Sequence, residues 1–253
     1  MKVCGISALV TGGGSGLGEA TARQLAERGA KVHVMDLNAD AADHVASEIG
    51  GVAIVGDVAS EADASRAVSL AAEHGDGLRI LVNCAGIGPA SRVVGRDGVM
   101  PLADFQHAIT VNLVGTFNMI RLAADHMSRL AEIEDKARGV IVNTASVAAF
   151  DGQIGQAAYA ASKGGIVSMA LPIARELARF GIRVNTIAPG IFLTPLLYGL
   201  PEEAQQSLAS AIPYPQRLGD PKEYADAVCF CIDNQYLNAE VIRLDGGIRM
   251  QPK

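Results

Sequence analysis

The sequence predicts a single α/β domain built on a doubly wound parallel sheet of about seven strands, with helices on both faces. Three observations predict this fold. Short apolar runs of strand length alternate along the chain with amphipathic stretches of helical length. The short runs are apolar at successive positions, as in strands that are buried on both faces. No internal repeat, low-complexity tract or linker interrupts the 253 residues, so residues 1–253 are expected to form one domain.

The elements of the N-terminal part alternate between strand and helix. Each apolar run is followed by a stretch in which charged and small apolar residues mix, as in an amphipathic helix. We predict strands at Val3–Val10, Lys31–Asp36, Val52–Asp57 and Leu78–Asn83, and helices at Gly18–Arg28, Ala39–Ile49 and Glu61–His74.

The C-terminal part continues the alternation with longer helices. Pro172 lies inside one of them and predicts a kink, because a proline leaves the carbonyl of Ser168 without its helical donor. We predict helices at Phe105–Arg129, Tyr159–Phe180 and Pro221–Cys231, and strands at Val140–Asn143, Arg183–Ile187 and Glu240–Leu244.

Composition and charge exclude several classes of protein. Hydrophobic residues make up 49% of the chain, with 28 Gly and no Trp, which favours a soluble α/β protein over an all-β one. The net charge of −6 argues against a nucleic-acid partner, since that would require a basic face. No uncharged apolar stretch is long enough to span a membrane, and no secretory signal is recognisable. We therefore expect a cytoplasmic protein with no membrane contact.

Cysteine and histidine give no sign of a metal site. Cys4, Cys84, Cys229 and Cys231 lack metal-ligand spacing, and the five histidines are dispersed. Free thiols and no bound metal are expected.

A glycine-rich loop joins the first predicted strand to the first helix. Glycines let the backbone approach a pyrophosphate closely, and the following helix N-terminus supplies N–H donors. The spacing is G-x-x-x-G-x-G rather than the familiar G-x-G-x-x-G, and a simple tight turn is the alternative. The strand–loop–helix context favours a dinucleotide site of Rossmann type, formed by Gly12, Ser15, Gly16, Leu17 and Gly18.

The predicted dinucleotide is NAD. Asp36 ends the second strand, where a carboxylate accepts hydrogen bonds from the ribose hydroxyls and repels a 2′-phosphate, and no arginine follows it. The alternative is a surface aspartate that caps the next helix, although Asn38 is the better cap. The ends of the next two strands add Asp57, Val58, Asn83, Cys84, Ala85 and Gly86 as expected cofactor contacts.

One helical turn separates Tyr159 from Lys163, and Ser146 follows a predicted strand. Residues four apart share a helix face, so the ammonium is expected to lower the phenol pKa from about 10. A phenol tuned in this way can exchange a proton with a substrate oxygen. Alone, the Tyr-x-x-x-Lys spacing is also compatible with a solvated helix face.

Together these segments resemble the short-chain dehydrogenase/reductase family over essentially the whole chain. The glycine loop, Asn83–Gly86 and the order of Ser146, Tyr159 and Lys163 carry the resemblance. It implies a catalytic tetrad completed by Asn112, whose role would be to hold a water next to the lysine. It also implies a homotetramer. The Pro189–Thr194 segment matches a further family motif and adds the expected cofactor contacts Pro189, Gly190, Phe192 and Thr194.

Within the family the chain is most similar to the branch of type 2 3-hydroxyacyl-CoA dehydrogenases. Asn143–Phe150, Gly155–Tyr159, Leu171–Arg175 and Val241–Asp245 carry this likeness. It implies NAD-dependent oxidation of an (S)-3-hydroxyacyl-CoA to a 3-oxoacyl-CoA. The alternatives are a hydroxysteroid or other secondary alcohol, a 3-oxoacyl reductase, or an NAD-binding scaffold without activity.

The expected substrate contacts lie around the reacting oxygen. Tyr159 would take the hydroxyl proton, Ser146 would hold the same oxygen, and Gln153 could meet a substrate carbonyl or only cap a loop. The apolar segment at about 191–219 is placed to act as a lid and suits an acyl chain or a steroid. Core packing or a subunit interface is the alternative for this segment.

Overall fold

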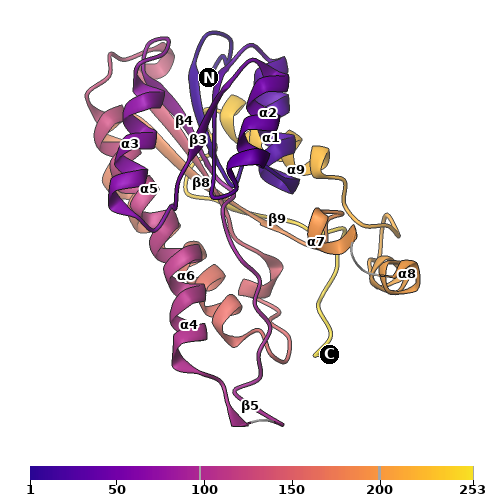
Figure 1. Cartoon of the computed structure of the whole chain (residues 1–253). Coiled ribbons are helices and arrows are strands. Elements are labelled where there is room, and N and C mark those ends of the chain that lie inside the picture. The colour runs from indigo at the N-terminus through magenta and orange to yellow at the C-terminus, as the bar shows by residue number, and fades with distance from the viewer. Residues whose placement is uncertain (97, 199–200, 253) are drawn as a thin grey trace.

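The centre of the protein is a parallel sheet. The computed structural model describes residues 1–96, 98–198 and 201–252. Its strands are β1 (Ser7–Thr11), β2 (Lys31–Asp36), β3 (Val52–Val55), β4 (Leu78–Asn83), β7 (Gly139–Thr144), β8 (Ile182–Pro189) and β9 (Val241–Leu244). They form one seven-stranded sheet in the order β3-β2-β1-β4-β7-β8-β9, in which every pair is parallel (Figure 1). The predicted fold class is confirmed.

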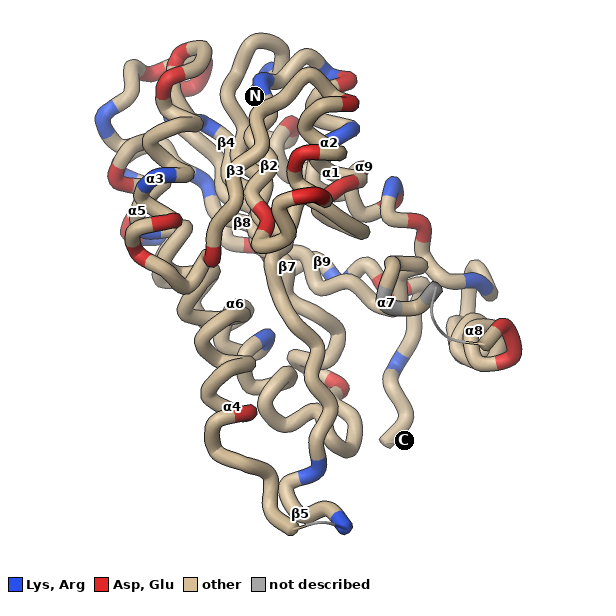
Figure 2. Tube along the Cα trace, viewed as in Figure 1, with Lys and Arg blue, Asp and Glu red and all other residues tan. Residues whose placement is uncertain are grey.

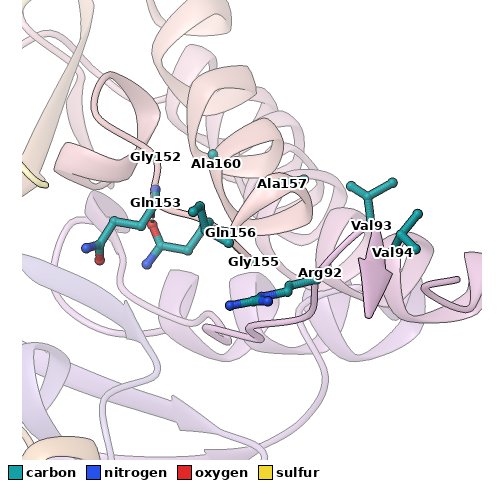
Figure 3. A pocket seen from close by; sticks show the side chains of 10 residues that line it. Arg92, Val93, Val94, Gly152, Gln153, Gly155, Gln156, Ala157 and Ala160 are labelled. Carbon is teal, nitrogen blue, oxygen red and sulfur yellow. Dashed lines mark hydrogen bonds between the residues drawn. The ribbon is translucent and has the colours of Figure 1, made fainter. Parts of the chain in front are cut away.

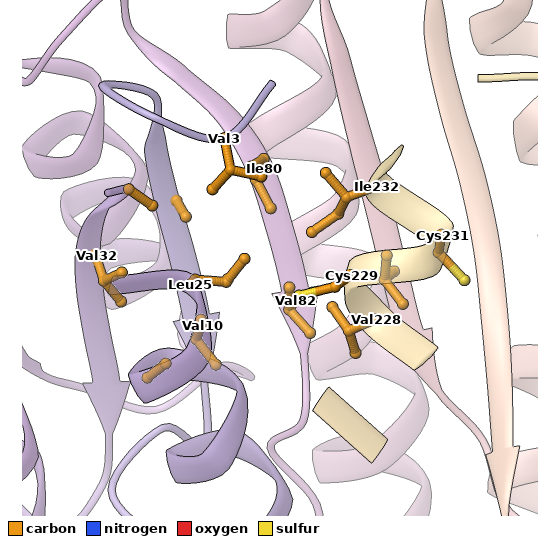
Figure 4. Close-up of a cluster of buried hydrophobic side chains, with 14 of the residues drawn as sticks. Val3, Val10, Leu25, Val32, Ile80, Val82, Val228, Cys229, Cys231 and Ile232 are labelled. Carbon is orange, nitrogen blue, oxygen red and sulfur yellow. The ribbon is translucent and has the colours of Figure 1, made fainter. Parts of the chain in front are cut away.

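Helices cover both faces of the sheet. The α-helices in the described part of the chain are α1 (Gly16–Glu27), α2 (Ala39–Ile49), α3 (Glu61–Ala72), α4 (Leu102–Ile109), α5 (Gly115–Ser128), α6 (Ala157–Leu177), α7 (Pro195–Tyr198), α8 (Glu202–Ser210) and α9 (Pro221–Asp233). Of these, α4, α7 and α8 lie away from the sheet (Figure 1). One core lies between the sheet and α1, α2 and α9, and includes Val10, Leu25, Val82 and Val228 (Figure 4). The other lies under α3, α5 and α6. The apolar strands are therefore buried on both sides, as their composition predicts.

The strand order predicts a crevice at the carboxyl ends of the central strands. From β1 the chain winds outward through β2 to β3, and then returns to the other side of β1 to form β4. Such a reversal leaves the carboxyl ends of β1 and β4 open between connections that diverge, which is where open α/β sheets bind ligands.

The long helix predicted at Phe105–Arg129 is interrupted. A π-helical turn at Thr110–Val114 separates α4 from α5. Two tertiary contacts accompany this turn: the amide of Asn112 turns inward to bind the backbone of Ile87, and Gly115 packs so closely on Val58 that a Cβ there would come within 2.6 Å of the Val58 side chain. Side-chain periodicity does not signal such a turn.

Pro172 lies inside α6, and the helix continues through it from Ala157 to Leu177. One further difference from the prediction concerns the segment before α4. The chain before α4 forms a small antiparallel hairpin, β5 (Val94–Gly95) with β6 (Gly98–Val99), which was not predicted. Its two-residue strands are too short for an apolar alternation to be recognisable.

None of the helices in the described ranges is both long and apolar enough to cross a membrane.

Candidate active site

A cavity of about 710 Å³ opens at the carboxyl ends of the central strands. Its lining runs from the glycine loop after β1 to the segment that enters α7. Of the residues predicted from the sequence as contacts, the cavity is lined by Gly12, Ser15, Gly16, Leu17, Gly18, Asp36, Asp57, Val58, Cys84, Ala85, Gly86, Ser146, Tyr159, Lys163, Pro189, Gly190, Phe192 and Thr194. Three predicted residues lie outside this lining: Asn83, Asn112 and Gln153.

The glycine loop presents backbone to the cavity. Gly12 has a left-handed φ of 62°, and a Cβ on it would lie 2.7 Å from the Ala85 nitrogen. The N-cap Ser15 makes no side-chain hydrogen bond to the first turn of α1. Gly16, Leu17 and Gly18 of that turn line the cavity, so the positive end of the helix dipole lies at the cavity, an arrangement that fits a pyrophosphate.

Asp36 turns its carboxylate toward the same loop. Its Oδ2 accepts a hydrogen bond from the Gly14 nitrogen at 3.0 Å, and its Oδ1 accepts one from the Asn38 nitrogen at 3.0 Å. The cap of α2 is Asn38, whose side chain accepts from the Ala41 nitrogen. Because Asp36 does not cap the helix, its remaining lone pairs are available at the cavity wall, where a ribose diol would fit.

Ser146, Tyr159 and Lys163 meet at the end of β7. Ser146 follows β7, and its Oγ accepts a hydrogen bond from the Ala148 nitrogen at 3.1 Å. Tyr159 and Lys163 lie in the first two turns of α6, and the Lys163 Nζ is 5.8 Å from the centre of the Tyr159 ring. The same Nζ donates to the Thr144 carbonyl at 2.9 Å. The three predicted catalytic groups thus share one wall of the cavity.

Burial dominates the electrostatics of this pair. It raises the pKa of Tyr159, and hydrogen bonding with Ser146 offsets only part of that rise. Burial also lowers the pKa of Lys163 to about 8. The expected lowering of the phenol pKa by Lys163 is therefore not found in this state. The physical reason is that the low-dielectric surroundings disfavour the charged form of both groups.

Asn112 is fully buried beside α6. Its Oδ1 accepts from the Ile87 nitrogen at 2.8 Å, and its Nδ2 donates to the Ile87 carbonyl at 2.9 Å and to Ser162 Oγ at 3.0 Å. Ser162 Oγ in turn donates to the Tyr159 carbonyl at 2.7 Å. The Asn112 side chain therefore ties the loop after β4 to the turn of α6 that carries Tyr159, and its amide is committed to protein groups.

Asn83 lies inside the sheet rather than at the cavity. Its Nδ2 donates to Asn143 Oδ1 at 2.9 Å, and its carbonyl accepts from Thr144 Oγ1 at 2.6 Å. Because that bond uses the only hydroxyl hydrogen of Thr144, the 2.6 Å contact between Thr144 Oγ1 and Tyr224 must have the Tyr224 hydroxyl as donor. This network fixes Thr144, whose carbonyl accepts the hydrogen bond from Lys163 Nζ. The sequence offers no signal for Tyr224, which comes from α9.

Gln156 reaches the catalytic cavity, whereas Gln153 does not. Gln153 lines a second pocket of about 630 Å³, and its Nε2 donates to the Gln251 carbonyl at 2.9 Å (Figure 3). Gln156 lines both pockets, and its Oε1 accepts from the Gln153 nitrogen at 3.0 Å. Its position three residues before Tyr159, one helical turn away, is the sequence signal that would have identified it.

The predicted lid contributes part of the cavity wall. Thr194, Pro195 and Leu197 line the cavity from the start of α7. Residues 199 and 200 of the predicted lid lie outside the described residues. Figure 2 shows charged residues of both signs on α1, α2, α3 and α5. The charged side chains in the described lining of the cavity are Asp36, Asp57 and Lys163.

Gly18→Ala is expected to weaken coenzyme binding at least tenfold, because its Cβ would overlap the Gly12 carbonyl and force the loop apart. Titration of the protein with NADH, followed by fluorescence, measures the change. Gly164→Ala is the matched control, since a Cβ on this helical glycine meets open space. Equal affinity of Gly18→Ala and the unsubstituted protein would contradict the assignment of the loop.

The comparisons with known proteins agree with this geometry. The family model of short chain dehydrogenases matches residues 7–205, which include the glycine loop and the three predicted catalytic residues. The chain belongs to this family. Membership makes it an oxidoreductase of the short-chain dehydrogenase type, as the glycine loop and the Tyr159–Lys163 spacing predicted.

Several similar proteins share one description. The chain is 53% identical to the 3-hydroxyacyl-CoA dehydrogenase type-2 of Bos taurus, over 99% of this chain and 98% of that protein. It is 52% identical to the protein of the same description from Homo sapiens, with the same coverage. A crystal structure of 3-hydroxyacyl-CoA dehydrogenase type-2 from Mycobacterium avium matches with a TM-score of 0.95 and 42% identity over all of both chains. The predicted branch of the family is confirmed.

Proposed function

We propose that this protein oxidises (S)-3-hydroxyacyl-CoA thioesters to 3-oxoacyl-CoA thioesters with NAD as the hydride acceptor. The observation that carries the proposal is the meeting of Ser146, Tyr159 and Lys163 in the same cavity as the glycine loop and Asp36. Relatives with more than half of their residues identical bear the name of this activity, which supports the choice of substrate.

The catalytic groups divide the work of moving one proton. Tyr159 accepts the hydroxyl proton of the substrate as the tyrosinate and becomes a neutral phenol, and Ser146 donates a hydrogen bond to the same oxygen. The Lys163 ammonium stabilises the tyrosinate before it takes the proton, and the Thr144 carbonyl holds that ammonium in place. Asn112 and Ser162 position the backbone of Tyr159.

The coenzyme supplies the hydride acceptor when it is bound. The first turn of α1 would hold its pyrophosphate, and Asp36 would hold the ribose of its adenosine half. The carboxylate of Asp36 would repel a 2′-phosphate, which supports NAD over NADP.

The cavity suits an apolar substrate chain attached to the reacting alcohol. Leu197 and Ile191 supply apolar surface from the lid segment, and Gln156 supplies the amide nearest to the catalytic tyrosine in sequence. We also propose that residues 191–219 close over the substrate, that the protein works as a homotetramer, and that it is cytoplasmic.

The decisive experiment is NADH formation with three substrates in parallel. We expect turnover of 3-hydroxybutyryl-CoA and of its 2-methyl form, and slower or no turnover of estradiol. Turnover of estradiol without activity on either thioester would replace the proposed substrate by a steroid. No NADH from any of the three would contradict the function.

Asp36→Asn is expected to raise the KM for NAD by roughly 10–100-fold and to improve the use of NADP relative to NAD, because a charged acceptor of ribose hydrogen bonds is lost. The ratio of kcat/KM for the two coenzymes measures the effect. Asp40→Asn on α2 is the control, since its carboxylate is exposed in the first turn and does not line the cavity. An unchanged ratio in Asp36→Asn would contradict the proposed specificity.

A further inference from the structure

The chain after β9 contacts the loop between Ser146 and α6. Ile248 is buried, with 2% of its surface exposed, and residues 249–252, here called the C-terminal strap, follow it. The Gln251 carbonyl accepts from Gln153 Nε2 at 2.9 Å, and the Pro252 carbonyl accepts from the Ile154 nitrogen at 3.0 Å. These two bonds join the strap to the loop between Ser146 and α6.

Arg243 joins this loop to the residues that precede the strap. The Arg243 guanidinium lies 2.7 Å from Asp151 Oδ2 and 2.9 Å from Asp245 Oδ2, and it donates to the Ile248 carbonyl at 3.2 Å. It keeps the pKa of Asp151 below its usual range. Because one cation bridges the loop, Asp245 after β9 and Ile248 directly before the strap, these segments are held together.

Met250 is the strap residue that lines the catalytic cavity. It is partly buried, and it shares that cavity with Ser146, Tyr159 and Leu197. A methionine side chain is apolar and flexible, so it fills irregular space and adapts to a bound chain. The polar catalytic groups and this apolar side chain thus face the same space.

The strap is also connected to the other wall of the cavity. Gln153, which donates to the strap, donates through its backbone nitrogen to Gln156 Oε1, and Gln156 lines the cavity next to Tyr159. A shift of the strap would therefore move Gln156 as well as Met250.

We infer that the C-terminal strap is a specificity-determining wall of the substrate cavity, with Met250 as the side chain that contacts the acyl chain. The inference rests on the proposed function for the identity of that chain. The chain lengths accepted by the protein then depend on the bulk of residue 250, because the strap is held in place and cannot easily yield to a larger side chain.

The test compares the kcat/KM ratio of a ten-carbon to a four-carbon 3-hydroxyacyl-CoA in two variants. Met250→Trp is expected to lower this ratio by at least about tenfold, because a bulky side chain takes space that only the longer chain needs. Met250→Ala is expected to change the ratio toward the longer chain. Gln251→Ala is the matched control, since the strap uses the backbone carbonyl of Gln251 and this carbonyl remains.

Each outcome decides the inference. NADH affinity and the melting temperature are measured for every variant, so that a folding defect is recognised. If both Met250 variants keep the unsubstituted ratio, the strap is not a wall of the substrate site. If the unsubstituted protein oxidises neither thioester, the proposed function has failed, and the ratio is measured with 2-decanol and 2-butanol instead. An unchanged ratio there overturns the inference independently.

Discussion

Tyr159→Phe is expected to lower kcat for alcohol oxidation by about 10²–10⁴-fold, because it removes the proton acceptor of the reaction. The ring stays in place, so the packing of α6 and the position of Lys163 above the ring are kept. NADH affinity is expected to change less than threefold, on the order of the effect of one lost weak contact. The loss therefore falls on kcat rather than on coenzyme binding.

Steady-state oxidation at saturating NAD and an NADH titration measure the two quantities for Tyr159→Phe. Tyr236→Phe is the matched control, because its side chain is fully exposed and lies outside the cavity lining. Turnover of Tyr159→Phe at the rate of the control would exclude Tyr159 as the proton acceptor.

Lys163→Met is expected to have opposite effects on activity and on stability. It removes the ammonium that stabilises the tyrosinate, so activity is expected to fall by at least about 10²-fold. The same ammonium is buried, and its pKa is lowered to about 8. The protonated form therefore destabilises the fold, by roughly 3 kcal/mol at neutral pH from the size of that shift.

The sign of the stability effect follows from the two pKa values of the lysine. Below pH 8 the lysine is charged in the folded and in the unfolded chain, and the full penalty is present. Between about 8 and 10.5 the folded form loses its proton first, and the penalty disappears above that range. Loss of the bond from Lys163 to the Thr144 carbonyl offsets part of the gain. A net stabilisation of about 1 kcal/mol is expected at pH 7.

Urea unfolding at several pH values measures the stability difference for Lys163→Met. We expect the variant to be more stable than the unsubstituted protein at pH 7, with a difference that narrows as the pH rises from 8 to 10. Lys222→Met on α9 is the control, since this residue lies outside the cavity lining and carries no comparable burial. Lower stability of Lys163→Met at pH 7 would show that the buried ammonium does not destabilise the fold.

The fold could be predicted from the sequence because its signals are local. Each of the seven strands is an apolar run, and the alternation with helices allows only a parallel sheet covered on both faces. The π-turn at Thr110–Val114 could not be predicted, since it depends on the bond between Asn112 and Ile87, two residues far apart in sequence. The strands of the β5–β6 hairpin have two residues each, which is too short for an alternation of apolar and polar residues to be recognised.

The site residues could be predicted where the residue type and its place after a strand or in a helix indicate a single role. The glycine loop, Asp36 and the Tyr159–Lys163 pair lie at the cavity where the sequence placed them. Gln153 and Gln156 are the counterexample, because two glutamines three residues apart offer the same chemistry and only the start of α6 decides which one faces the cavity. Met250 and Tyr224 could not be predicted, because they reach the site from parts of the chain that are distant in sequence from the glycine loop and from Tyr159.

The π-turn at Thr110–Val114 acts as a one-residue insertion between α4 and α5. A π-turn contains one residue more than an α-helical turn, and one residue corresponds to a rotation of about 100° around the helix axis. The insertion lets α4 pack on α6 while α5 packs on α3. Deleting one residue from this turn would bring the two halves into a common helical phase and rotate Asn112 away from Ile87 and Ser162. The length of the turn, and not only the identity of its side chains, therefore fixes where the Asn112 amide points.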